Sequence, residues 1–311
     1  MTEARDSVNG SDTARDNTAR ETTARDTVRW EELRPDQFRA RLADCPIAYL
    51  PMGLVEPHGH VAALGLDTIK AEWLCERTAV RMGGIVAPTQ AWHVHETGYH
   101  APWLEEVVGE QDTYLGGVPP HVLYHMVLYQ LRAIANAGFR ACVLLTGHCG
   151  GNERDLASLA RAFTARFGLE VLVLRDVDLA TQFQGDHAGK FEVSQLMFIR
   201  PDLVDLSLLE RGREPGSGGR QALGDDAGEA SVELGRAIMT ASLERFDAII
   251  TDLKHRLPAK LERIALHAVD ALWQGLLESS DQWVALNLHP NQRAAHPGSR
   301  WHTGAAERTS R

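Results

Sequence analysis

The chain has 311 residues, of which 44% are hydrophobic and 24% are charged, and its formal net charge at pH 7 is −10. This length is enough for the core of one large domain or two small ones. The negative charge argues against a general binder of nucleic acids or anionic membranes, because phosphate groups would be repelled. No apolar run approaches the roughly 20 residues of a membrane span, and the N-terminus lacks the apolar core of a signal peptide. We therefore expect a cytoplasmic protein with neither kind of partner.

The two ends of the chain differ in composition from the middle. Residues 1–28 contain a degenerate repeat, TARDN TARET TARDT, that is almost free of large apolar side chains. Such a segment cannot bury enough surface to offset its ordering entropy, so we predict a disordered tail. Residues 286–311 have a similar composition and are predicted to form a flexible C-terminal tail. The folded domain is expected at residues 29–285.

Between the tails, short apolar runs alternate with amphipathic stretches. In chain order, the pattern predicts a strand at 47–53, a helix at 67–83, a strand at 84–90, a helix at 119–138, a strand at 139–147, a helix at 152–168, a strand at 169–176 and a helical region at 229–277 in two pieces around Pro258. Continuous apolar strands between amphipathic helices indicate βαβ units and a parallel sheet covered on both faces. Ligands of such folds gather at the carboxyl ends of the strands.

Three clusters of polar side chains follow predicted strands and precede predicted helices. They are Glu56, His58, His60 and Asp67 in EPHGHVAALGLD, then His148, Cys149 and Asn152 in TGHCGGN, and Asp186, His187 and Glu192 in GDHAGKFEVS. In a parallel sheet these strand ends face the same side, so the clusters could converge. Simpler interpretations exist. A lone histidine at a strand end is usually just solvated, HGH could be a turn whose imidazoles cap backbone groups, and GHCGGN could be a glycine-rich turn before a helix N-terminus, which is a natural anion site.

Convergence of the clusters would suit metal chemistry. Carboxylates and imidazoles bind Zn²⁺, Mn²⁺ or Fe²⁺, and the scarcity of thiolates argues against a structural zinc site rich in cysteine. The ligand set suggests two ions bridged by one aspartate. Two ions about 3.5–4 Å apart can hold a bridging hydroxide and polarise a carbonyl group. A nearby imidazole can then carry the proton to the leaving group.

These motifs resemble those of the creatininase (creatinine amidohydrolase) family. EPHGHVAALGLD is similar to the family pattern E-x-H-G-x-H-L-P-L-x-x-D, TGHCGGN to N-G-H-G-G-N or N-G-H-Y-E-N, and DHAGKFEVS to D-H-A-G-x-x-E-T-S. The resemblance covers roughly residues 45–245. The chain departs from the family where His60 stands one place before the usual second histidine, where Thr146 replaces Asn, and where Gly150 occupies a position that is Glu in some members.

The resemblance implies a fold, an activity and a set of roles. The fold would be a three-layer α/β/α sandwich with a mainly parallel central sheet. Two divalent metal ions (Zn, Mn or Fe) would be cofactors in the hydrolysis of C–N bonds, in an amide, lactam or formamide of a small polar metabolite. The enzyme would be a homo-oligomer, commonly a hexamer. One ion would take Glu56, Asp67 and His148, the other His58, Asp67 and Glu192; His187 would be the catalytic proton shuttle and Asp186 would orient it.

Substrate contacts are expected from the loop AWHVHETGYHAPW and from the second cluster. The candidates are Trp92, His95, Trp103 and Cys149. Because this loop departs from that of creatininase itself, we expect little turnover of creatinine. Two other functions stay open at this point. The chain could be a non-catalytic member of the fold that binds a ligand or assembles, or a metal-dependent lyase or isomerase acting on a sugar-like carbonyl.

Overall fold

The structure is a computed structural model, and it describes residues 27–95, 97–98, 100–108, 114–150, 153–214, 219–296 and 298. The predicted N-terminal tail lies outside the described residues up to residue 26, and the predicted C-terminal tail does so beyond residue 298. Asn152, from the second polar cluster, is also outside them. None of the helices in the described part of the chain combines the length and the apolar composition that crossing a membrane requires.

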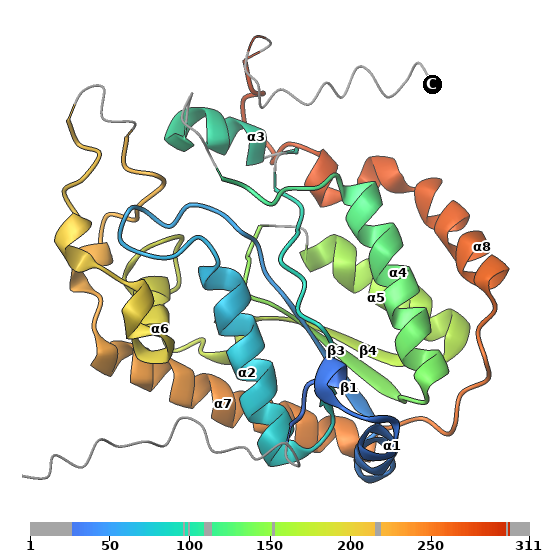
Figure 1. Ribbon diagram of the computed structural model, residues 1–311. Coiled ribbons are helices and arrows are strands. Elements are labelled where there is room, and N and C mark those ends of the chain that lie inside the picture. The colour runs from blue at the N-terminus through green and yellow to red at the C-terminus, as the bar shows by residue number, and fades with distance from the viewer. Residues whose placement is uncertain are drawn as a thin grey trace, which may run out of the picture.

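A parallel sheet of four strands stands at the centre of the described chain (Figure 1). The strands are β1 (Ile47–Met52), β2 (Ile85–Val86), β3 (Ala141–Thr146) and β4 (Glu170–Arg175), in the spatial order β2-β1-β3-β4. Each was predicted, but β2 is shorter than the expected 84–90. Pro88 has no backbone N–H to give to the ladder, and the chain meets β1 again only where Met52 pairs with Gln90.

Helices cover both faces of the sheet. Their bounds are α1 (Pro35–Asp44), α2 (Leu66–Met82), α3 (His100–Trp103), α4 (Pro120–Ala137), α5 (Glu153–Phe167), α6 (Lys190–Ile199), α7 (Val232–His255) and α8 (Leu266–Leu277). In Figure 1, α2, α6 and α7 lie on one side of the strands and α4, α5 and α8 on the other. The predicted α/β sandwich with a parallel sheet is thus confirmed. The break between α7 and α8 contains Pro258, as expected from the sequence.

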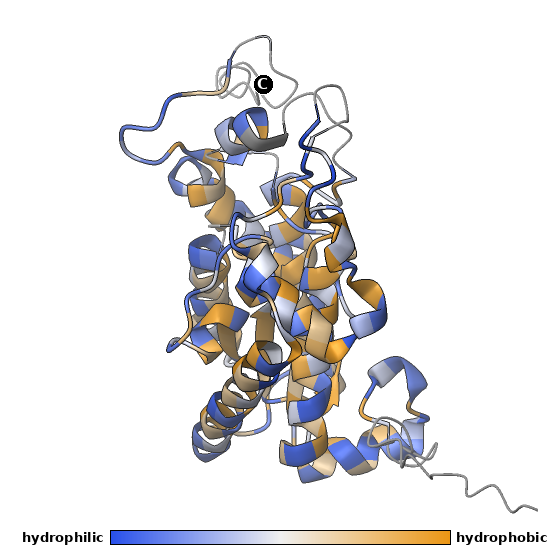
Figure 2. Ribbon diagram, turned by 90° about the vertical axis from the view of Figure 1, so that its left-hand side faces the viewer, coloured by the Kyte–Doolittle hydropathy of each residue, from blue (hydrophilic) through white to orange (hydrophobic). Residues whose placement is uncertain are grey.

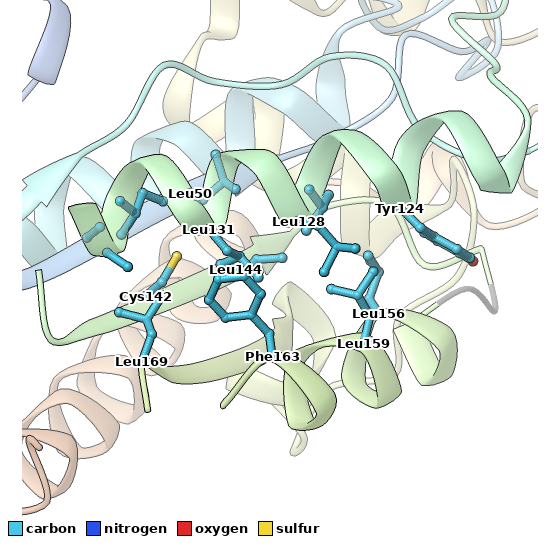
Figure 3. Close-up of a cluster of buried hydrophobic side chains, with 14 of the residues drawn as sticks. Leu50, Tyr124, Leu128, Leu131, Cys142, Leu144, Leu156, Leu159, Phe163 and Leu169 are labelled. Carbon is cyan, nitrogen blue, oxygen red and sulfur yellow. The ribbon is translucent and has the colours of Figure 1, made fainter. Parts of the chain in front are cut away.

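Alternate residues of the strands feed two cores. Leu50 and Leu144 pack with α4 and α5, whereas Tyr49 and Val143 pack with α2 and α7. Figure 3 shows the first core, in which the strand residues face the apolar stripe of α4 and Phe163 of α5. Figure 2 shows the same division on the helices, which carry hydrophobic residues on one side and hydrophilic residues on the other. Burial on both faces explains why the strands read as continuous apolar runs.

The register of the sheet brings three strand ends together. Met52 of β1 pairs with Thr146 of β3, and Thr146 pairs with Arg175 of β4. The residues that follow these three positions therefore leave the sheet at one edge. The first two polar clusters predicted from the sequence begin within a few residues of this line.

Candidate metal centre

Two glycines at the strand ends allow the N-terminus of α2 to lie directly against the sheet. A Cβ atom on Gly53 would overlap the backbone of Thr68, and one on Gly147 would overlap the carbonyl group of Asp67. Only a residue without a side chain permits such close backbone approach. Asp67, in the first turn of α2, is consequently held between the ends of β1 and β3, where its side chain is almost completely buried.

The first predicted metal set converges around one oxygen of Asp67. Nδ1 of His148 lies 2.8 Å from Oε1 of Glu56 and 3.4 Å from Oδ2 of Asp67. One ligand atom from each of these three residues lies within 4.8 Å of the others, and all three side chains are buried. Burial alone would raise the pKa of Glu56, but the neighbouring imidazoles, led by His148, outweigh it and lower that pKa well below its usual value. The carboxylate is therefore charged.

The second predicted set converges around the other oxygen of Asp67. Nε2 of His58 lies 3.3 Å from Oδ1 of Asp67 and 3.5 Å from Oε2 of Glu192. Nδ1 of His58 lies 3.1 Å from the backbone oxygen of Glu56, to which it can only donate. In the neutral ring, the lone pair of Nε2 therefore points at two carboxylates. This is the arrangement of a metal-binding histidine whose other nitrogen is fixed by a carbonyl group.

The residues of both sets fit divalent cations. Nε2 of His58 and both carboxylate oxygens of Asp67 are buried and make no hydrogen bond with any described residue. Buried polar atoms normally have a partner, and a cation between imidazole and carboxylate would supply one. Without a cation, burial would lower the pKa of His58, but Asp67 and Glu192 outweigh it and raise that pKa to about 9. The site therefore holds positive charge either as a bound cation or as the added proton of His58.

Lys70 supplies a positive charge that the sequence analysis missed. Its Nζ lies 2.5 Å from Oε1 of Glu192, 3.2 Å from Oδ2 of Asp176 and 3.5 Å from Oδ1 of Asp67, and its side chain is fully buried. Burial would lower the pKa of Lys70, yet Asp176 and Glu192 outweigh it and raise that pKa well above its usual value. A signal existed in the sequence: Lys70 is one helical turn after Asp67, on the face of α2 that turns inward.

Comparison with known proteins now decides the family. The family model for creatininase, described as creatinine amidohydrolase, matches residues 31–272 of this chain, which is well over half of it. The chain belongs to the creatininase family. By this membership it is a creatininase-like amidohydrolase, as the motifs indicated.

Individual relatives agree with this assignment. The creatinine amidohydrolase of Pseudomonas putida is 29% identical, over 55% of this chain and 71% of that protein. The 3-dehydro-scyllo-inosose hydrolase of Thermotoga maritima is 26% identical, over 44% of this chain and 40% of that protein. The crystal structure of a creatinine amidohydrolase (creatininase) superposes with a TM-score of 0.59 at 25% identity, covering 75% of this chain and 99% of the other.

His187 lies beside one residue of each predicted metal set, His58 and Glu56. Its ring stacks on that of His58 with centroids 4.8 Å apart, and its Nδ1 lies 3.9 Å from Oε1 of Glu56. The structure does not bring Asp186 to it, since no hydrogen bond among the described residues joins Asp186 to the His187 ring. The oxygen of Pro57 lies 3.0 Å from Nε2 of His187 and takes that place. Asp186 instead pairs with Asp226, and burial together with this contact raises its pKa to about 6.

The candidate substrate residues separate into two groups. His95 is buried, with Nε2 3.0 Å from Oε2 of Glu56, and Trp103 lies edge-on to both His95 and His187, at centroid distances of 5.6 and 5.3 Å. Trp92, in contrast, is 58% exposed, and a Cβ atom on Gly116 would lie 3.4 Å from its ring. The substrate contact expected of Trp92 stays a prediction.

Cys149 follows His148 but faces another partner. Its thiol lies 3.7 Å from Oδ1 of Asp176, the carboxylate that also contacts Lys70. The residue as a whole is exposed, but the protein atoms around the sulfur, together with the charge of Asp176, raise the pKa of the thiol well above its usual value. A thiolate is the reactive form of cysteine, so this environment argues against Cys149 as a nucleophile.

Two further histidines reach the centre without belonging to a predicted cluster. His93 is fully buried and its ring lies 5.3 Å from that of His148, while its Nδ1 accepts a hydrogen bond from the backbone of Val94. Burial and the neighbouring His148 lower the pKa of His93 to about 3. His100 stacks on His95, with centroids 4.5 Å apart. Both come from the loop that the sequence analysis assigned to substrate contact, and only its wealth of histidine signalled them.

Proposed function

We propose that this creatininase-family enzyme is a binuclear metal-dependent hydrolase of C–N bonds in an amide, lactam or formamide of a small polar metabolite. The observation that carries the proposal is the position of Asp67. Its two oxygens face two different ligand sets, Glu56 with His148 on one side and His58 with Glu192 on the other. A bridging carboxylate of this kind is what a pair of closely spaced cations requires.

Divalent cations bound there would polarise the carbonyl group of the substrate and lower the pKa of a water molecule. One related solved structure, at 25% identity, is described as Creatininase Mn, and another, a creatininase mutant at 24% identity, is described as a Zn-Zn type. These two relatives support manganese or zinc as the metal here, and the ligand chemistry also admits iron.

The chain's own residues would supply orientation and proton transfer. Nε2 of His187 donates to the backbone oxygen of Pro57, which leaves the acceptor nitrogen Nδ1 facing Glu56. That nitrogen can take a proton and pass it to the leaving amine. Trp103 lies against His187 and His95 and would exclude water from this side of the pocket. Lys70 holds Glu192 through one oxygen, while the other oxygen accepts a hydrogen bond from the backbone of Ala188.

The variant Asp67→Asn tests the proposal. It keeps the shape of the side chain but removes the bridging charge, so we expect the loss of both cations and a fall in hydrolysis of at least about 10³-fold, since metal catalysis contributes several kcal/mol. Metal content by elemental analysis and amine release from a panel of small lactams, amides and formamides are the two measurements. 3-Dehydro-scyllo-inosose, named for the related hydrolase from Thermotoga maritima, contains no nitrogen and should be tested separately, by following consumption of the ketone.

The matched control is Asp252→Asn on the exposed face of α7, where Arg256 is the only ion-pair partner of Asp252 among the described residues. This variant should keep both cations and full activity. If Asp67→Asn retained the metal content and the hydrolysis of the wild type, the proposed site would be wrong.

A further inference from the structure

The carboxylate of Glu56 divides its two oxygens between different neighbours. Oε1 lies 2.8 Å from Nδ1 of His148 and 3.9 Å from Nδ1 of His187, on the side of the first proposed ion. Oε2 lies 3.0 Å from Nε2 of His95. Both Glu56 and His95 are buried, and His95 belongs to none of the three family motifs. One oxygen therefore faces the ligands of a cation, and the other faces a residue from outside the motifs.

The contact with Oε2 determines which nitrogen of the His95 ring carries the proton. An ionised carboxylate only accepts hydrogen bonds, so Nε2, which faces it, is the donor. A proton on Nδ1 would have no acceptor among the described residues, although that nitrogen is buried. The ring of His148 differs, because its Nδ1 faces oxygens of both Glu56 and Asp67 and must lose its proton to bind the first ion.

The surroundings of His95 hold its ring in one orientation. The ring of His100 stacks on it, with centroids 4.5 Å apart and planes at 12°, and Trp103 lies edge-on with its centroid at 5.6 Å. The backbone oxygen of His95 accepts a hydrogen bond of 2.7 Å from the N–H of Thr97. The hydroxyl of Thr97 in turn donates to the backbone oxygen of Ala285. A donor that is locked by packing and hydrogen bonds can fix the geometry of the group that it contacts.

We propose that His95 is a positioning residue for the first cation, because its hydrogen bond with Oε2 orients Glu56 so that Oε1 faces the ion. Carboxylates that bind metals are commonly held by an outer hydrogen bond of this kind, and loss of the donor typically costs about 10–100-fold in metal affinity. The inference rests on the proposed function, since it requires an ion beside Glu56, His148 and Asp67. Without the donor, Oε2 would be left buried and unpaired, and Glu56 would be free to turn.

The test compares two amides of different length in place of His95. The side-chain amide of His95→Gln can stand where Nε2 stands and donate to Glu56, whereas that of His95→Asn is too short to reach it. Zn²⁺ is titrated into the stripped full chain in competition with a chelator of known affinity. The wild type and His95→Gln should bind about two ions per chain with similar affinities. His95→Asn should bind one of these ions about 10–100-fold more weakly.

The control is His125→Asn, which makes the same change in a half-buried histidine of α4 that stacks on Trp273. It should leave the affinities for both ions unchanged, and urea unfolding of each metal-free variant shows that it is folded. If His95→Asn bound both ions as tightly as the wild type, or if His95→Gln weakened binding as much as His95→Asn, the positioning role would be overturned and the paired sites would stand. If the wild type bound no Zn²⁺, or if Asp67→Asn bound it as the wild type does, the proposed function would fall and the role of His95 with it.

Discussion

At the scale of single residues, the centre is a problem of charge balance. Glu56, Asp67, Asp176 and Glu192 are four buried acids, and Lys70 is the one lysine among the described residues that contacts three of them. Separating a buried ion pair is costly because the remaining charge cannot be solvated. Lys70 therefore stabilises the centre before any cation binds, and it fixes the oxygen of Glu192 that faces away from His58.

Lys70→Met should consequently destabilise the metal-free protein by about 3–5 kcal/mol, since it leaves buried carboxylates without their partner. Urea unfolding of the stripped protein measures this free energy. The matched control Lys190→Met breaks an exposed pair with Glu229 and Asp226, and it should change the unfolding free energy far less, because solvent screens such pairs. Equal effects of the two substitutions would show that Lys70 does not neutralise the centre.

At the scale of elements, the segment that follows α8 makes hydrogen bonds with the loop that carries His93 and His95. Asp155 of α5 accepts hydrogen bonds from the backbone N–H groups of Val284 and Ala285, and the carbonyl oxygen of Ala285 accepts one from the hydroxyl of Thr97. Further on, Arg293 pairs with Glu106. The contacts of this segment extend beyond the boundary predicted at residue 285, and that boundary itself stays a prediction.

Asp155→Ala should weaken the attachment of residues 284–285 to α5. It leaves two backbone donors and the hydroxyl of Tyr124 without their acceptor, so we expect a loss of about 1–3 kcal/mol of stability. Proteolytic cleavage within residues 283–296 should become faster, which mass spectrometry of limited digests would detect. The control is Tyr124→Phe, which removes the hydrogen bond from Tyr124 but leaves those from the backbone of Val284 and Ala285. An unchanged digestion pattern in Asp155→Ala would contradict the role given to Asp155.

At the scale of the whole molecule, the sequence predicted the strands, from their apolar runs, and the site residues that directly follow strand ends. Apolar runs located the four strands, and the parallel topology then placed Glu56, His58 and His148 at one edge. Glu192 is assigned to the second set because Gly150 stands where some family members have Glu, and the structure places its Oε2 3.5 Å from Nε2 of His58.

The remaining parts of the site depend on tertiary contacts that no local pattern encodes. His100 stacks on His95 from the first residue of α3, and Asp155 resembles an ordinary acidic residue in the first turn of a helix. Helix geometry places Lys70 beside Asp67, but a lysine on a helix is usually solvated, so this signal was too weak to select it. The role of Asp186 comes from the resemblance and that of Trp92 from the loop. In the structure Asp186 pairs with Asp226, and Trp92 is exposed.

The most direct test of the central claim is a crystal structure of the metal-loaded protein with anomalous diffraction recorded at the absorption edge of the bound metal. The account predicts two peaks about 3.5–4 Å apart, each within bonding distance of a different oxygen of Asp67. One peak should also contact Glu56 and His148, and the other His58 and Glu192. A map with no peak at Asp67, or with a single ion bound by only one of its oxygens, would contradict the account.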